Sequence, residues 1–241
     1  MTELMAIVLA AGEGTRMKSA HPKVLHKVGG RPIAGHVLAA AREAGAGAIA
    51  MITGPGHEVV RKAMAAIDPE VAFFEQTERK GTAHAASMAR PAFAEASGYV
   101  AVVYGIREHK DASEAERAIG LCNACILAFR AEVFRALIDK VGTNNAQGEY
   151  YLTDLVELAN AAGHKVGYAV APEDNVMGVN DRAQLARAEA VFQQLRREDF
   201  MAAGVTLHDP GSVYFSFDTK IAPDVEIEPH VVFGPGVAIE S

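Results

Sequence analysis

The residues with the clearest chemical potential lie near the start of the chain, in Leu9-Ala-Ala-Gly-Glu-Gly-Thr-Arg16 and the pair Pro22-Lys23. They follow an apolar run over residues 5–9, which predicts a buried parallel strand. Glycines at the carboxyl end of such a strand let backbone N–H groups approach a phosphate closely. Because Arg16 and Lys23 add positive charge, this segment predicts a nucleotide-binding loop.

Three kinds of nucleotide-binding loop can be compared with this segment. A P-loop needs Gly-x4-Gly-Lys-Ser/Thr, which does not follow the strand. A dinucleotide-binding loop needs Gly-x-Gly-x-x-Gly, and here Gly12 and Gly14 fit but the third position is Met17. The spacing is similar instead to the signature of nucleoside-triphosphate:sugar-phosphate transferases. The remaining interpretation is a glycine-rich turn with two solvated cations.

Length and composition limit the classes of protein to consider. The chain has 241 residues, enough for one large domain or a domain with an appendage. Its formal net charge is −7 and it has no basic stripe, which argues against nucleic-acid binding but allows a local cationic pocket for a phosphorylated ligand. Since neither a transmembrane run nor a signal peptide is evident, we expect a cytoplasmic protein that binds no membrane.

The two cysteines, Cys122 and Cys125, lie in an apolar run over residues 121–127 that predicts a strand. A spacing of three on a strand directs two side chains to opposite faces, and two ligands do not close a zinc site. We therefore expect buried, inert thiols in a reducing compartment.

The first hundred residues alternate between strand and helix patterns, which predicts a Rossmann-like, mostly parallel sheet with helices on both faces. The predicted strands are residues 5–9, 48–53, 71–74, 99–104 and, later, 165–170. The predicted helices are residues 32–44, 57–66, 82–96, 149–162 and 181–203. Ligands of such sheets bind beyond the carboxyl ends of the strands, so loops 10–23, 75–82 and the segment after 104 are expected at one rim.

The end of the chain has a six-residue apolar period with glycine and proline at the turns. The two series are Ile221, Ile227, Phe233, Ile239 and Val225, Val231, Val237. This period predicts the first coils of a left-handed parallel β-helix, whose poorly covered ends would need further repeats or a partner chain. We divide the chain into a nucleotidyltransferase domain (1–203), a linker (204–220) and the β-helix start (221–241).

Polar residues at the predicted rim could bind a base and a metal. Gln76 carries an amide that can pair with a donor and an acceptor on a nucleobase, and Gly81-Thr82 offers a cap hydroxyl and free N–H groups at a helix start. Both are also common loop residues. A metal-dependent phosphoryl transferase needs a carboxylate after Tyr104-Gly105, but Ile106 follows.

Three isolated polar residues, Glu108, Asn123 and Asn180, stand next to apolar runs. Asn123 falls within the predicted strand and must find partners if it is buried, either a sugar hydroxyl or the backbone. Asn180 precedes the long helix, where a capping role is an open alternative.

Taken in order, these motifs resemble the bacterial N-acetylglucosamine-1-phosphate uridyltransferase family. That family forms the N-terminal half of bifunctional enzymes whose C-terminal half is a β-helix acetyltransferase. The resemblance also includes Glu75-Gln-Thr, Gly81-Thr-Ala-His84, Glu108-His-Lys-Asp111, Asn144-Asn-Ala-Gln-Gly-Glu-Tyr-Tyr-Leu-Thr-Asp154 and Gly178-Val-Asn180.

The resemblance implies a reaction in which UTP and N-acetylglucosamine 1-phosphate give UDP-N-acetylglucosamine and pyrophosphate. It assigns Arg16 and Lys23 as catalytic cations and Asn180 as a ligand of Mg²⁺. Substrate contacts are assigned to Leu9, Ala10, Ala11, Gly12, Lys23, Gln76, Gly81, Thr82, Tyr104, Gly105, Glu108, Asn123 and Asn180. The complete β-helix would form a homotrimer.

The chain departs from the family pattern at two places. The family continues Tyr-Gly with the second aspartate ligand of Mg²⁺ and several dozen residues, whereas Gly105 is followed directly by Ile106. A clean loss from the middle of a sheet would expose core, so we expect further residues between these two in the native protein. The β-helix also stops after its first coils, and the acetyltransferase site is absent.

Two alternatives to this function remain open, and the second follows from the absent aspartate. The first is a transferase for another hexose 1-phosphate, such as a thymidylyltransferase. The second is a nucleotide-sugar-binding or trimerisation module that no longer catalyses.

Overall fold

The computed structural model describes residues 4–103 and 123–240. Contacts divide the chain into two compact units. Unit 1 comprises Met1–Glu13 and Val37–Gly178, and unit 2 comprises Gly14–His36 and Val179–Ser241. The predicted boundaries at residues 203 and 220 stay a prediction.

Unit 1 is built on one five-stranded sheet with the order β5-β4-β1-β6-β7. Four of these strands run parallel to one another and β7 is antiparallel to β6. The strands are β1 (Leu4–Ala10), β4 (Ala46–Thr53), β5 (Ala72–Glu75), β6 (Tyr99–Val103) and β7 (Ile126–Arg130). The predicted Rossmann-like, mostly parallel sheet is thus confirmed.

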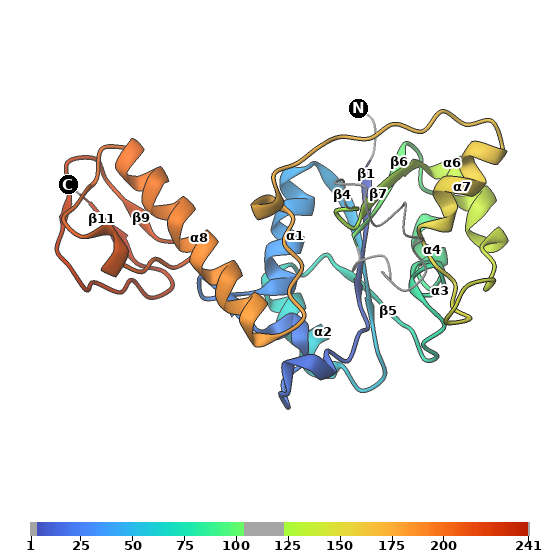
Figure 1. The fold of residues 1–241 in the computed structure, drawn as a ribbon, viewed down its shortest axis with the longest axis horizontal. Helices are drawn as coiled ribbons and strands as arrows, with labels where there is room; N and C mark the ends of the chain where they lie inside the picture. The colour runs from blue at the N-terminus through green and yellow to red at the C-terminus, as the bar shows by residue number, and fades with distance from the viewer. Residues whose placement is uncertain (1–3, 104–122, 241) are drawn as a thin grey trace. The chain divides into compact units, whose positions relative to one another are not determined.

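Helices cover both faces of this sheet, as Figure 1 shows, with α2 on one face and α3, α4, α6 and α7 on the opposite face. The helices are α2 (Glu58–Ile67), α3 (Thr82–Ser87), α4 (Arg90–Phe93), α6 (Ala131–Leu137) and α7 (Asp154–Ala161). Between sheet and helices, Phe93 and Phe134 are fully buried and meet edge to face at 5.1 Å between ring centroids. Each such buried ring contributes about 1.5–3 kcal/mol to folding.

The strand register brings several chain segments to one rim of the sheet. Ala10 lies opposite Thr53, and Thr53 lies opposite Glu75. On the other side of β1, Val103 pairs with Ile126, the first residue of antiparallel β7. Segments that follow Ala10 and Glu75 and the segment that precedes Ile126 therefore share this rim.

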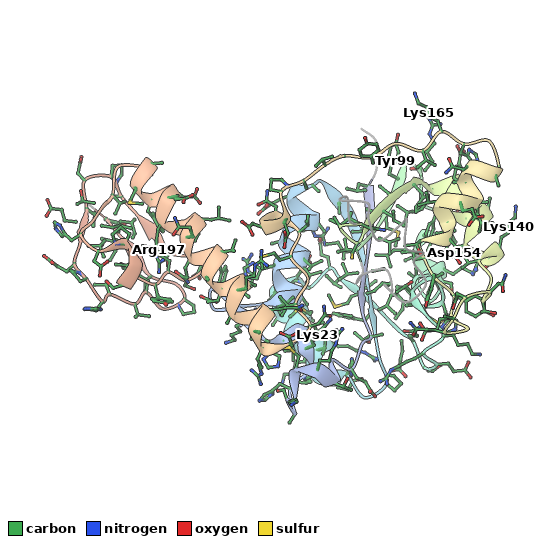
Figure 2. The ribbon with its side chains drawn as sticks, viewed as in Figure 1. Lys23, Tyr99, Lys140, Asp154, Lys165 and Arg197 are labelled. Carbon is green, nitrogen blue, oxygen red and sulfur yellow. The ribbon has the colours of Figure 1, made fainter. Side chains whose placement is uncertain are left out.

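Unit 2 is organised around the 21-residue helix α8 (Arg182–Ala202). Its other elements are η1 (Thr15–Met17), η2 (Lys23–Leu25), β2 (Lys27–Val28), β3 (Arg31–Pro32), β8 (Thr206–Leu207), η6 (Pro210–Ser212), β9 (Lys220–Ile221), β10 (Glu226–Ile227) and β11 (Ala238–Ile239). The unit boundary falls within α1 (Ile33–Glu43). From α8, Arg197 donates to the Val213 carbonyl at 3.0 Å through Nε (Figure 2).

At the end of unit 2, short segments that lie 18 to 20 residues apart in the sequence pair in parallel. These pairs are β8 with β10, Tyr214 with Val232, and β9 with β11. Buried side chains fill the space between them, and the rings of Phe215 and Phe233 stack at 5.3 Å. Both six-residue series pack against or within this cluster. The apolar period is thus an inward-facing pattern.

A Gly29-Gly30 hairpin joins β2 to β3 and contacts α8. Gly29 has φ +54°, and a Cβ there would lie 2.2 Å from Cε1 of Phe192. Its N–H donates to Glu189 at 2.7 Å, and its carbonyl accepts from the Phe217 N–H at 2.7 Å. Only glycine satisfies this backbone conformation and this close approach.

The predicted helix over residues 82–96 is wrong in its middle, because it is divided into α3 and α4. Pro91 stands at the start of α4, where its missing N–H is tolerated; inside one long helix it would break the hydrogen-bond ladder. The predicted helix over 149–162 begins only at Asp154, since Tyr150 uses its backbone N–H and carbonyl to bind Lys80 and Ala83.

The strand predicted over residues 165–170 is also wrong, because the structure describes these residues without regular structure. Their alternating apolar side chains Val166, Tyr168 and Val170 are 43%, 85% and 73% exposed. Alternation predicts a strand only where a neighbouring strand accepts its hydrogen bonds.

None of the helices in the described parts of the chain is long and apolar enough to cross a membrane.

Candidate nucleotide-binding site

The first part of the glycine loop extends from the end of β1 in unit 1. Ala10 and Ala11 are buried, while Gly12 is exposed and a Cβ on it would meet no described atom within 4 Å. The small size of Gly54 allows close packing here, because a Cβ on it would lie 3.0 Å from the Ala11 carbonyl. The loop therefore presents small residues and an open backbone, as a phosphate-binding loop requires.

The second part of the loop belongs to unit 2. Gly14 has φ +63°, and a Cβ on it would lie 2.4 Å from the Cβ of Lys23. Met17, at the position where a dinucleotide-binding loop needs its third glycine, is 1% exposed. Its N–H donates to the Gly14 carbonyl at 2.9 Å, which closes the turn. Gly14 thus allows Lys23 to pack closely against the loop.

Lys23, which is labelled in Figure 2, is partly buried. Its Nζ donates to Oδ1 of Asn180 at 3.1 Å. Burial, followed by the positive charge of Arg16, lowers the pKa of Lys23 below its ordinary value. Arg16 itself is exposed, and no ion pair joins it to another residue in the described ranges. The two predicted catalytic cations therefore lie near enough to interact electrostatically, with Lys23 the better fixed of the two.

Asn180 stands immediately before α8. The N-cap of this helix is Asp181, whose carboxylate accepts from the Gln184 N–H at 2.8 Å. Asn180 donates its own N–H to Oε1 of Gln184 at 2.7 Å. Capping is thus the role of Asp181, and the side chain of Asn180 is left to bind Lys23.

Gln76 follows β5 at the rim and is 5% exposed. Its N–H continues the sheet by donating to the Thr53 carbonyl at 2.9 Å. The side-chain Nε2 lies 3.1 Å from the Gly81 carbonyl and 3.1 Å from Nδ1 of His84. Arg79 in the same loop forms an ion pair with Glu13 of the glycine loop.

Gly81 and Thr82 are held by the segment around Tyr150. Gly81 has φ +108°, and a Cβ on it would lie 2.5 Å from the Tyr150 carbonyl oxygen. The expectation that the Thr82 hydroxyl caps α3 is wrong, because Gly81 is the N-cap of this helix. The Thr82 hydroxyl accepts instead from the Leu152 N–H at 2.9 Å. The Ala83 N–H is also occupied, by the Tyr150 carbonyl at 2.9 Å.

Asn123 is exposed and lies before β7, so the prediction that it stands within a strand is wrong. Its Oδ1 accepts from the Cys125 N–H at 2.8 Å, and Cys125 has φ +64°, which delays the start of the strand. Burial raises the pKa of Cys125 to about 11, in agreement with an inert thiol. Tyr104, Gly105, Glu108 and Cys122 lie outside the described residues.

Among the described residues, Asn180 is the one that the resemblance assigns to Mg²⁺. The described residues contain no group of three or more His, Cys, Asp or Glu side chains that could hold a metal ion. Mg²⁺ is usually bound by one or two carboxylates together with substrate phosphates and water. Asn180 offers one amide oxygen, which accepts from the Lys23 ammonium and has a second lone pair. Any divalent metal would depend on oxygens other than those that the described residues bring together here.

The fold and the glycine loop define a nucleotidyltransferase-type α/β domain. Residues 6–105 match the family model of the MobA-like NTP transferase domain. Two solved structures share the fold: a UDP-glucose pyrophosphorylase complexed with UDP-glucose (TM-score 0.57) and the inositol-1-phosphate CTP transferase from T. maritima (TM-score 0.59). Each is 14% identical and covers 81% of this chain; the match includes 100% and 97% of those chains, respectively.

The more specific similarity is to the proteins named bifunctional protein GlmU. The chain is 42% identical to the one from Bradyrhizobium sp. (strain ORS 278) and 43% identical to the one from Xanthobacter autotrophicus. Each match covers 98% of this chain and 63% of the relative. The resemblance inferred from the motifs is thus confirmed, and the chain corresponds to somewhat less than two thirds of these bifunctional proteins.

The alignments also show that the relatives are longer within the matched region. The match to the Bradyrhizobium protein extends over 283 residues, whereas this chain has 241, so at least 42 aligned positions have no counterpart here. This agrees with a missing segment of several dozen residues.

Two features of the site were not identified from residue chemistry. The first is His84, which contacts Gln76. The second is the segment 144–154, whose backbone holds residues 80–83 and whose Asn145 binds the Glu149 N–H at 3.1 Å and the Gln147 N–H at 3.2 Å. Both belong to the motifs that carry the resemblance, but their contacts could not be predicted from sequence, because contacts between distant segments leave no local pattern.

Proposed function

We propose that this chain is a uridyltransferase that converts UTP and N-acetylglucosamine 1-phosphate into UDP-N-acetylglucosamine and pyrophosphate. The observation that carries the proposal is the fixed lysine of the glycine loop: Gly14 admits Lys23 at a distance no other residue would allow, and Asn180 holds its ammonium. The similarity to bifunctional GlmU proteins over 98% of the chain supports the same substrates.

The residues of this chain would act by binding and charge neutralisation. The sugar phosphate is already an anionic nucleophile, so its oxygen attacks the α-phosphorus of UTP in line without a general base. Lys23 and Arg16 stabilise the charge that develops on the phosphates and on the departing pyrophosphate. Ala10, Ala11 and Gly12 would hold the phosphates, and Gln76 the base.

Magnesium is part of this proposal only as a partner of the nucleotide phosphates. Asn180 is the one described residue proposed to contact it, and Ile106 stands where the family has an aspartate. We propose that the missing segment begins after Gly105. This chain therefore would depend on substrate oxygens to hold the metal, and no step of the mechanism above is assigned to it.

The end of the chain supports a proposal about assembly. The inward-facing six-residue period and the parallel pairs 18 to 20 residues apart agree with the first coils of a left-handed β-helix. A longer β-helix would complete the acetyltransferase half and a homotrimer. A cytoplasmic location and a role in cell-wall precursor synthesis are proposed with it.

Two assays on the full chain test the function. Isothermal titration with UDP-N-acetylglucosamine measures binding, and pyrophosphate release with Mg²⁺, N-acetylglucosamine 1-phosphate and UTP or dTTP measures turnover. We expect binding and a faster release with UTP than with dTTP. Binding without release would support the non-catalytic module that Ile106 suggests, faster release with dTTP would favour a thymidylyltransferase, and the absence of both would overturn the proposal.

A further inference from the structure

We propose that His84 is a positioning residue that fixes the orientation of the Gln76 amide, so that the site accepts uracil or thymine and rejects cytosine. The inference rests on the proposed function, in which Gln76 reads the base. It concerns which atom of Gln76 is offered to that base.

The orientation of the amide follows from its two neighbours. The Gly81 carbonyl can only accept a hydrogen bond, so the Gln76 atom at 3.1 Å from it must be the nitrogen. The second hydrogen of Nε2 then points to Nδ1 of His84, also at 3.1 Å. Both hydrogens of the amide are therefore used within the protein.

His84 must take one particular form to make this contact. Since Nδ1 accepts from Gln76, it carries the lone pair and the proton is on Nε2. The assignment comes from the donors and acceptors around the ring, because hydrogen positions are inferred and not observed. The protonated ring, or the other tautomer, would place two donors against each other.

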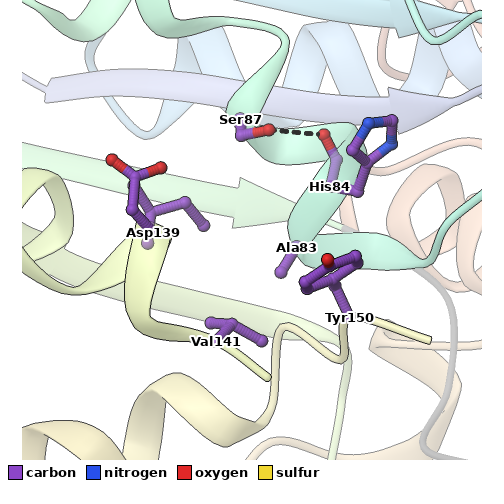
Figure 3. A pocket seen from close by; sticks show the side chains of 7 residues that line it. Ala83, His84, Ser87, Asp139, Val141 and Tyr150 are labelled. Atoms are coloured by element: carbon purple, nitrogen blue, oxygen red, sulfur yellow. Dashed lines mark hydrogen bonds between the residues drawn. The ribbon is translucent and has the colours of Figure 1, made fainter. Parts of the chain in front are cut away.

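The ring of His84 is itself held in place by its surroundings. It lies beside the Tyr150 ring, with centroids 6.4 Å apart and an interplanar angle of 31°, at the wall of a pocket of about 170 Å³ (Figure 3). Tyr150 in turn binds Lys80 and Ala83 through its backbone at 2.8 and 2.9 Å. The segment that contains Gly81 and His84 is thus held by the backbone of Tyr150, and both residues contact the Gln76 amide nitrogen.

The remaining amide atom, Oε1, is the one available to a ligand. No donor in the described ranges binds it, although Gln76 is 5% exposed. A carbonyl oxygen in this position accepts from the N3–H of uracil or thymine, but it repels the N3 lone pair of cytosine. A buried polar mismatch of this kind costs about tenfold or more in affinity.

The test uses His84→Phe, which keeps an aromatic ring beside Tyr150 and removes the acceptor. Dissociation constants of UTP, dTTP and CTP are measured by titration of the full chain and of the variant. We expect the wild-type preference for UTP over CTP to fall by about three- to tenfold, as the loss of one hydrogen bond predicts, while the UTP to dTTP ratio stays unchanged. Asp139→Asn, which alters another residue of the same pocket wall whose side chain pairs with Arg90, should leave both ratios unchanged.

The outcomes separate the inference from the function. If the wild-type chain binds no uridine nucleotide, the proposed function fails. If it prefers UTP and His84→Phe keeps that preference, or weakens all three nucleotides equally, the positioning role is wrong. If His84→Phe does not fold, the inference can still be tested on the wild-type chain. The ¹⁵N chemical shifts of His84 should show a protonated Nε2 and an unprotonated Nδ1, and the opposite pattern would overturn the inference.

Discussion

At the scale of single residues, Lys23 combines three properties that a surface lysine lacks. It packs against Gly14, its ammonium binds Asn180, and burial beside Arg16 lowers its pKa. The sequence predicted its importance from the strand, the glycines, Arg16 and the Pro22-Lys23 pair taken together. It could not predict the contact with Asn180, because 157 residues separate the two along the chain.

We predict that Lys23→Ala lowers the rate of pyrophosphate release by about 10²-fold or more, since it removes a charge that stabilises the transition state. Lys27→Ala, which alters an exposed lysine four positions on, should change the rate by less than about twofold. Unchanged turnover in Lys23→Ala would contradict the catalytic role.

Cys125 leads to a prediction about stability at high pH. Burial raises the thiol pKa from 9.0 to about 11, so the folded chain holds this proton more tightly than the unfolded chain. The corresponding stabilisation is present below pH 9 and is lost as the pH rises to about 11, with a size on the order of 2 kcal/mol. Urea unfolding at a series of pH values should show a shallower alkaline decline for Cys125→Ala than for the unmodified chain. Parallel declines would show that the thiol does not contribute.

At the scale of elements, the local sequence pattern was sufficient to predict helices with a regular apolar face and strands that are buried on both sides. Strands β1, β4, β5 and β6 and helices α1, α2 and α8 were predicted within about two residues. The failures occurred where distant backbone competes for hydrogen bonds, as at Tyr150, or where a left-handed residue delays a strand, as at Cys125. The Gly29-Gly30 hairpin was not identified.

That hairpin gives the clearest prediction for an element. In Gly29→Ala the new Cβ would lie within 2.8 Å of three atoms of the Phe192 ring, in a backbone with φ +54°. We expect a loss of about 2–4 kcal/mol in the free energy of unfolding, from the left-handed conformation and from overpacking. Gly47→Ala is the matched control, because its Cβ meets open space and its φ is not positive. Equal urea midpoints for the two variants would contradict the packing argument.

At the scale of the whole molecule, several observations agree with the missing segment that we propose after Gly105. At least 42 positions of the aligned relatives have no counterpart in this chain, and Ile106 replaces the expected aspartate. Residues 165–170 keep the alternation of a strand but expose Tyr168 and Val170. A sequence shows which residues alternate, but whether a neighbouring strand is present to pair with them depends on the rest of the chain.

The absence of an aspartate directly after Gly105 in this sequence leads to a prediction about metal binding by the protein alone. The described residues contain no group of three or more His, Cys, Asp or Glu side chains that could hold a metal ion, and the one amide oxygen proposed to contact it, from Asn180, also accepts from Lys23. We therefore expect Mn²⁺, titrated into the full chain without nucleotide and followed by electron paramagnetic resonance, to bind no more tightly than about millimolar, as a site with few oxygen ligands and no carboxylate pair should. Asn180→Ala should not change that weak affinity.

When UTP is added, the metal should bind through the phosphates, and Lys23→Ala should then weaken the ternary complex. Micromolar Mn²⁺ binding by the protein alone would contradict this prediction, because it would require a carboxylate outside the described residues to complete a metal site.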